Sequence, residues 1–146
     1  MALPNPRFEA SFARIFGQEI GMDDRADAFF QAFYERFTKA PAINVMFAST
    51  DMEQQVQMLK KSLFQLVSYY VLGKPTPELD RLAELHARLK LPADMFDLWM
   101  RALIDTAGQF DDEFDESTEL AWCWALAPAL AYMQLHLHNP QQHPTK

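Results

Sequence analysis

Apolar side chains recur every three or four residues along nearly the whole chain, which is the spacing of helices that bury one face. No segment shows a convincing two-residue alternation, the pattern of a half-buried strand. Glycine is scarce, at four in 146 residues, as suits a helix-rich chain. The pattern predicts an all-α fold of six or seven helices with mostly short connections.

Breaks in this pattern divide the chain into expected helices. Asp23 and Asp24 lie where an N-cap is needed, as do Ser49, Thr50 and Asp51 before a later helix. The chain turns polar after Tyr132, which predicts a fraying tail. The expected helices cover residues 6–20, 24–39, a single turn from Pro41 to about Phe47, 52–71, 77–89, 92–110 with Pro92 opening it, and 116–137.

Length and composition predict one domain over residues 1–146, with a core at about 8–135. No apolar run approaches the roughly 20 residues of a membrane span, and no secretory signal is visible, so a cytoplasmic protein is expected.

The net charge of −7 argues against nucleic acid as a partner. Cys123 is alone, so it forms neither an intramolecular disulfide nor a cysteine cluster, and we expect a buried bystander thiol.

Several familiar catalytic and metal motifs are absent from the sequence. It contains no Gly-rich phosphate loop, no HExxH and no G-x-S-x-G. No paired Glu-x-x-His motifs occur, which argues against a di-iron bundle. The acidic residues 111–115 lack the glycine and the spacing of a calcium loop, so a solvated connection is expected there.

The four histidines fall into two groups. His136, His138 and His143 lie in the polar tail, where surface positions are expected even though a His-x-His pair can bind metal. His86 instead lies on an apolar stripe of its helix, four residues after Leu82. A single histidine on such a face is most often a core residue with a satisfied hydrogen bond, so its position alone does not establish a metal role.

The residues that follow His86 strengthen a metal role. Leu91 and Pro92 form a corner, and Phe96 lies one turn inside the next expected helix. A histidine-bearing helix, a tight corner and a new helix with an aromatic residue make an apolar slot beside the imidazole. A flat hydrophobic macrocycle with an axial ligand needs such a slot.

Three segments of the sequence together resemble bacterial globins. Residues 82–96 are similar to the proximal helix and following corner of that family, and Pro41 with Phe47 six residues later resembles the globin corner whose phenylalanine packs on haem. Residues 121–133 resemble the final helix of single-domain and sensor-type bacterial globins. The likeness spans about residues 8–135 and extends to the haem domains of globin-coupled sensors and flavohaemoglobins. It implies the globin fold, a three-on-three helical sandwich.

The resemblance implies haem b with His86 as the iron ligand and O₂, NO or CO as the gas. The distal donor is expected one turn before an inward aliphatic residue, which favours Gln55 before Leu59 over Gln54 before Met58. The helix of residues 52–71 contains no histidine, so a distal histidine is excluded. The expected wall residues are Phe47, Leu59, Leu82, Leu91, Phe96, Leu126 and Leu130, and Lys60, Arg88 and Lys90 are candidate partners of the haem propionates.

A second distal position lies on the helix of residues 24–39. Spacing from Pro41 and Phe47 favours Phe33, whereas the tyrosine that related globins often use there favours Tyr34. The choice stays open at this point, and it matters because only a tyrosine hydroxyl can donate to a bound gas.

Several roles are compatible with this resemblance. The leading one is reversible gas binding; the alternatives are a gas or redox sensor acting through a separate signalling partner, and a haem-free globin-like interaction domain. Enzymatic turnover as an NO dioxygenase or a peroxidase would need an external reductase, since the sequence carries no flavin or nicotinamide domain. A homodimer through the last two helices is expected by family analogy.

Overall fold

The computed structural model describes residues 5–17, 24–89, 91 and 94–138, and this part of the chain contains only helices and their connections. The all-α prediction is confirmed. The seven helices are α1 (Pro6–Phe16), α2 (Asp24–Phe37), α3 (Pro41–Met46), α4 (Met52–Leu72), α5 (Pro77–Arg88), α6 (Met95–Phe110) and α7 (Glu116–His138).

Side-chain caps fix the first residues of α4 and α5. The Asp51 carboxylate accepts hydrogen bonds from the backbone N–H groups of Glu53 and Gln54 at the start of α4. Thr76 caps α5 by accepting from the N–H of Leu79. Gly73 ends α4 in the left-handed region, with φ of 73°, where glycine is the favoured residue. The chain therefore reverses between α4 and α5 at a defined point.

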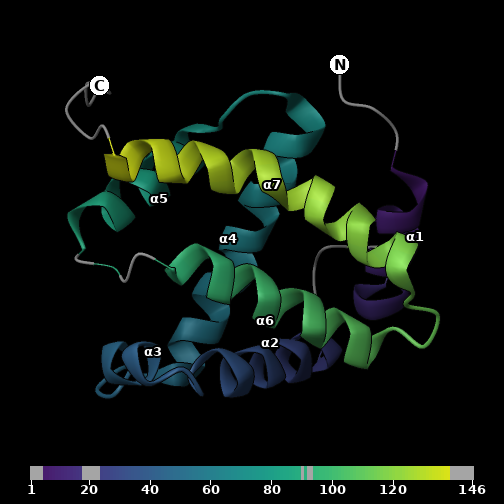
Figure 1. Ribbon diagram of the computed structural model, residues 1–146, viewed down its shortest axis with the longest axis horizontal. Coiled ribbons are helices and arrows are strands. Elements are labelled where there is room, and N and C mark those ends of the chain that lie inside the picture. The colour runs from purple at the N-terminus through teal and green to yellow at the C-terminus, as the bar shows by residue number, and fades with distance from the viewer. Residues whose placement is uncertain (1–4, 18–23, 90, 92–93, 139–146) are drawn as a thin grey trace.

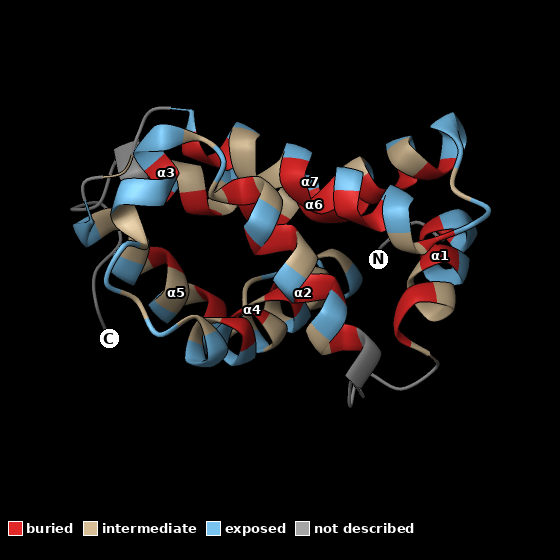
Figure 2. Ribbon diagram, turned by 90° about the horizontal axis from the view of Figure 1, so that it is seen from below, coloured by how far each residue is buried: buried red, intermediate tan, exposed pale blue. Residues whose placement is uncertain are grey.

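The helices cross one another around a shared interior. In Figure 1, α7 runs along the top, α6 and α2 run below it, and α4 crosses behind them. Helix α2 packs mainly on α6, and α7 packs against α1, α4 and α5. Buried residues lie on the inward faces of α2, α6 and α7, whereas α3 is largely exposed (Figure 2). None of the described helices combines the length and apolar character that crossing a membrane requires.

The end of the molecule that contains α1 has a core of packed aromatic rings, which we call the aromatic end. Trp122 is fully buried and meets the Phe8 ring edge-on, with 4.9 Å between ring centroids. Phe16 packs edge-on against Phe29 at 4.8 Å, and Phe29 reaches Phe110 on α6 at 5.4 Å. Offset and edge-to-face ring pairs of this kind add stability beyond their buried area.

A polar network crosses the aromatic end. The Asp111 carboxylate accepts hydrogen bonds from Ser11 Oγ at 2.6 Å and from Arg14 Nε at 2.6 Å, and Trp122 Nε1 donates to Ser11 Oγ at 2.9 Å. Burial raises the pKa of Asp111, but the hydrogen bonds from Arg14 and Ser11 outweigh it and hold the pKa below its usual value. The expectation that residues 111–115 form a wholly solvated loop is therefore wrong for Asp111, which is only 2% exposed.

Three other expectations need correction. Helix α6 begins at Met95 rather than at Pro92, which lies outside the described residues. Helix α7 continues to His138, so the chain does not fray after Tyr132. His136 is 3% exposed and its ring lies 4.7 Å from that of Tyr132, so the surface position expected for it is wrong. The side chain of His138 and all of His143 lie outside the described residues.

Cys123 is half-buried rather than enclosed, and burial raises the pKa of its thiol. A raised pKa keeps the thiol protonated and unreactive at neutral pH. The expectation of a bystander thiol is thus consistent with its surroundings.

Candidate functional site

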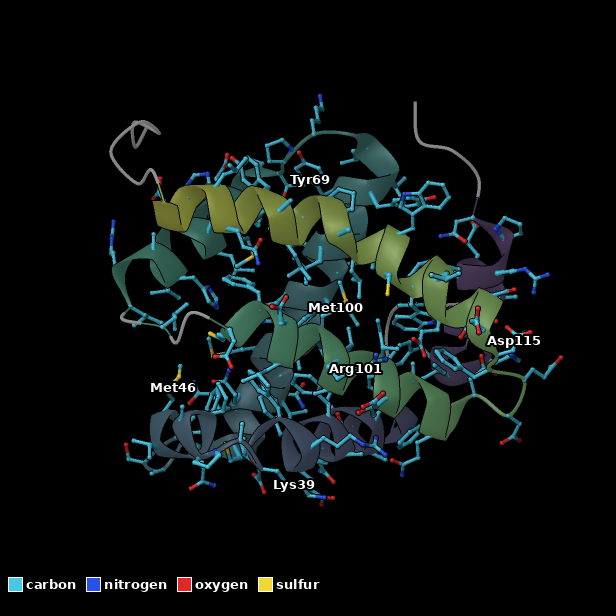
Figure 3. The ribbon with its side chains drawn as sticks, viewed as in Figure 1. Lys39, Met46, Tyr69, Met100, Arg101 and Asp115 are labelled. Atoms are coloured by element: carbon cyan, nitrogen blue, oxygen red, sulfur yellow. The ribbon has the colours of Figure 1, made fainter. Side chains whose placement is uncertain are left out.

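A cavity of about 420 Å³ lies at the end of the molecule opposite α1, and we call this the cavity end. Its walls come from α2, α3, α4, α5, α6 and α7. Met46, which lines the cavity, and Asp115, which lies beside α1, mark the two ends in Figure 3. Most of the lining side chains are apolar, and the polar groups among them are Tyr34, Gln55, Ser62 and His86. A largely apolar cavity with a few polar groups is typical of a small-molecule or cofactor site.

His86 reaches this cavity from the last turn of α5. Its Nδ1 lies 2.9 Å from the backbone carbonyl oxygen of Leu82. A carbonyl oxygen only accepts hydrogen bonds, so Nδ1 carries the proton. Burial lowers the pKa of His86, and the bond to Leu82 offsets only part of that effect. The imidazole is therefore neutral at pH 7, with a lone pair left on Nε2.

Tyr34 and Gln55 form a hydrogen-bonded pair on the same cavity. Gln55 Nε2 donates to the Tyr34 hydroxyl oxygen at 3.1 Å, joining α4 to α2. Burial raises the pKa of Tyr34 to about 12, and the bond from Gln55 reduces this shift only in part. The hydroxyl thus stays protonated, and because its oxygen accepts from Gln55, its own hydrogen remains available for a ligand.

The side chains of Phe33 and Tyr34 occupy different parts of the molecule. Tyr34 lines the cavity, whereas Phe33 is fully buried between α2 and α6, with its ring centroid 5.8 Å from that of Trp99. Gln54, the alternative to Gln55, is exposed. Tyr34 and Gln55 are therefore the pair that the fold brings together.

The predicted wall residues divide into two groups. Leu126 is fully buried but does not line the cavity. The other six line the cavity together with His86: Phe47, Leu59, Leu82, Leu91, Phe96 and Leu130.

The mouth of the cavity lies between α4 and α5. Three cavity-lining side chains are also strongly exposed: Met58 at 48%, Leu85 at 46% and Leu89 at 49%. Exposed apolar side chains that gather at one opening mark a binding site more often than singly scattered ones do.

The predicted propionate partners are not placed together at this mouth. Lys60 forms an ion pair with Asp27 on α2, and Arg88 is exposed without lining the cavity. Lys90 lies outside the described residues.

Comparisons with known proteins bear on this arrangement. A crystal structure of a Pseudomonas aeruginosa protein, reported as structurally highly homologous to a human haemoglobin, superimposes with a TM-score of 0.77. The two chains are 27% identical, and the match covers 91% of this chain and 97% of the other. This chain has the globin fold. No protein-family model and no curated protein matches the sequence.

Sequence reasoning missed several residues that line this cavity. Half of its eight methionines line the cavity, namely Met46, Met58, Met95 and Met133. Helical spacing could have found some of them, because Met58 and Ser62 follow Gln55 by three and seven residues on α4. Phe37, Leu66, Leu85, Leu89 and Trp99 complete the set that was not named as walls.

The donor set of this cavity fits haem. No cluster of three or more His, Cys, Asp or Glu side chains able to hold a bare metal ion occurs among the described residues. A porphyrin brings four nitrogen ligands of its own, so it needs one further ligand and apolar walls. His86 Nε2 provides the first, and the leucine, methionine and aromatic side chains of the cavity provide the second.

Proposed function

We propose that this globin holds haem b through His86 and reversibly binds a diatomic gas, O₂, NO or CO. The observation that carries the proposal is the neutral imidazole of His86, with Nδ1 bonded to the Leu82 carbonyl and its ring on an apolar cavity. When bound, ferrous haem would supply an iron that His86 would hold and that can bind one small gas. The protein supplies the orientation of the imidazole, the dry walls and the hydrogen-bond donors.

The Leu82 carbonyl fixes both the tautomer and the ring orientation of His86. Because burial lowers the pKa of His86, the ligating nitrogen does not compete with a proton at neutral pH. A protonated imidazole has no lone pair to offer a metal. This part of the site therefore favours a stable bond to the iron.

Tyr34 and Gln55 give the cavity a hydrogen-bond donor for a polar ligand. The hydroxyl of Tyr34 keeps its proton, and Gln55 holds that hydroxyl in place. A donor fixed in a low-dielectric cavity stabilises partial negative charge on a bound ligand more strongly than water does. This pair favours ligands that accept a hydrogen bond, O₂ above all.

An absorption spectrum of the purified protein tests haem binding. We expect a Soret band that shifts when the protein is reduced and exposed to CO. His86→Ala should abolish the band while far-ultraviolet circular dichroism keeps its helical signal. His136→Ala is the matched control, because His136 lies outside the cavity lining. A colourless protein that takes up no added haemin would contradict the proposal and favour a haem-free interaction domain.

Ligand release tests the distal pair. Gln55→Leu and Tyr34→Phe should each speed the dissociation of O₂, by about tenfold if one hydrogen bond to the ligand is lost. Gln54→Leu is the matched control, since Gln54 is the exposed neighbour on the same helix. Stopped-flow displacement by CO gives the rates, and unchanged rates in both distal variants would mean that neither residue contacts the gas.

The homodimer expected from the family resemblance stays a prediction. Helix α7 exposes Leu120 at 63%, Trp124 at 70% and Leu135 at 56%, which favours a partner on this face. Sedimentation velocity should show a dimer that Trp124→Glu dissociates, and a wild-type monomer would dismiss the idea. The cytoplasmic location and any turnover with an external reductase also stay predictions.

A further inference from the structure

A second hollow lies beside the cavity, on the outer side of α4 and α5, with a volume of about 890 Å³. We call it the α4–α5 groove; its walls include Lys60, Lys61 and Phe64 from α4 and Arg81, Leu82 and Leu85 from α5. Its size falls within the range of about 300–1,000 Å³ that is usual for ligand pockets.

Both helices contribute apolar side chains to this groove. Phe64 is 43% exposed and Leu85 is 46% exposed, although both are large hydrophobic side chains. Leu82 lies between α4 and α5 and is half-buried. Exposed apolar groups that share one concave surface offer a ligand far more buried area than the same groups would if scattered. The floor of the groove therefore suits an apolar chain.

The charged residues that line the groove are Lys60, Lys61, Arg81 and Glu78, so the groove carries a net positive charge in a chain whose net charge is −7. Lys61 has no ion-pair partner among the described residues, and Lys60 is engaged by Asp27. Arg81 is paired only with Glu78 one turn earlier, at 3.4 Å, and both side chains are more than half exposed. An exposed pair of this kind contributes little free energy, so Arg81 can exchange Glu78 for another anion.

We propose that the α4–α5 groove binds a monocarboxylic acid with a long apolar chain, of the fatty-acid class. Lys61 and Arg81 receive the carboxylate, and the chain lies along Phe64, Leu82 and Leu85. Charge complementarity selects the carboxylate, since the rest of an acidic surface repels anions. The charged end of the groove lies outside the cavity, because Lys61, Phe64 and Arg81 do not line it, whereas Leu82 and Leu85 form a wall that the groove and the cavity share.

Calorimetric titration of dodecanoate, below its micelle concentration, into the full-length protein tests the proposal. We expect one molecule bound per chain, and about a tenfold loss of affinity in Lys61→Glu and in Arg81→Glu. Arg101→Glu is the charge control, because Arg101 lies on α6 outside the groove. Dodecyltrimethylammonium, with the same chain and opposite charge, should not bind. Equal affinity of the two charge-reversed variants and the wild type would overturn the proposal.

A matched pair of variants separates the groove from the cavity. Phe64 lines only the groove, and Leu89 lines only the cavity; both are exposed enough to be replaced without loss of the fold. Phe64→Asp should weaken dodecanoate binding by at least about tenfold, while Leu89→Asp should leave it unchanged. The reverse result would place the acid in the cavity and overturn the proposal.

A final experiment tests whether the groove binds a free fatty acid, through its carboxylate, or a lipid surface, through its phosphate headgroups. The protein should not co-float with vesicles of phosphatidylglycerol, because a bilayer headgroup does not enter a concave groove with its chain. Co-flotation that Lys61→Glu and Arg81→Glu both abolish would overturn the assignment to a free acid.

Discussion

The two ends of this molecule are filled in different ways. At the aromatic end, the Trp122 ring packs against Phe8 and the Phe12 ring against Phe16, and a hydrogen-bonded carboxylate crosses the core. At the cavity end, flexible methionine and leucine side chains surround about 420 Å³ of space, and three of them reach solvent. We infer that close packing at the aromatic end stabilises the fold, and that this stability allows the cavity end to leave room for a ligand.

The largest expected effect is at the aromatic end. Trp122→Ala should lower the free energy of unfolding by about 3–5 kcal/mol, because it leaves a cavity among rigid rings and removes a donor to Ser11. Urea unfolding followed by circular dichroism measures the change.

Trp124→Ala, measured at a protein concentration at which the chain is monomeric, is the matched control on the same helix, since Trp124 is 70% exposed. Its free energy of unfolding should stay within about 0.5 kcal/mol of the wild type. Similar losses in the two tryptophan variants would break the distinction between a packed and an open face of α7.

A smaller effect is expected when the cavity end is filled. Haemin at a hundredfold excess over its dissociation constant should stabilise the folded chain by about 2.7 kcal/mol. Hydrogen exchange followed by mass spectrometry should show the larger gain in protection in α5, which carries His86, and a smaller one in α1. An equal gain in both helices would show that the two ends do not open independently.

A further loss is expected when the polar network of the aromatic end is cut. Asp111→Asn removes the charge that Arg14 and Ser11 bond, and should destabilise the protein by about 1–3 kcal/mol. Asp112→Asn changes an exposed neighbour and should be close to neutral. Chemical unfolding at neutral pH distinguishes them, and equal behaviour would mean that burial of Asp111 contributes nothing.

The smallest effect concerns pH at the cavity end. Burial lowers the pKa of His86 below its ordinary 6.5, so below pH 6.5 the unfolded chain binds more protons at this residue than the folded chain does. Stability therefore falls as the pH drops from 6.5 toward the folded pKa. Urea unfolding at several pH values should show this slope in the wild type and a flatter one in His86→Gln. An identical slope in both would mean that His86 is not buried as a neutral ring.

Local patterns in the sequence predicted the helices well because caps and apolar spacing act within one turn. Asp51 and Thr76 bond N–H groups two or three residues away, so the starts of α4 and α5 can be read directly from the sequence. His86 could be singled out for the same reason, since its stripe and the corner after it are contiguous in the chain. The order and spacing of the motifs then supported the resemblance to globins, which in turn implied the roles of the haem-side residues.

Two of the failures depended on partners far away in sequence. Asp111 is buried because Arg14, 97 residues earlier, reaches it. The choice between Phe33 and Tyr34 needed the rotation of α2 against α4, which the hydrogen bond from Gln55 reveals. No local pattern contains the contact of Asp111 with Arg14 or that of Tyr34 with Gln55. The third failure was local: α7 continues past Tyr132, and the His136 ring packs edge-on against the Tyr132 ring four residues earlier, although the tail reads as polar.

The hydrogen bond from His86 to Leu82 has a consequence for how the site tolerates mutation. Its acceptor is a main-chain carbonyl, which every amino acid possesses, so replacing the side chain at position 82 leaves the orienting contact in place. Many side chains at this position could therefore reshape the cavity wall, or the groove outside it, without turning the imidazole. Position 82, whose carbonyl orients the His86 imidazole, thus tolerates substitution. Variation there can alter ligand preference while His86 keeps its orientation.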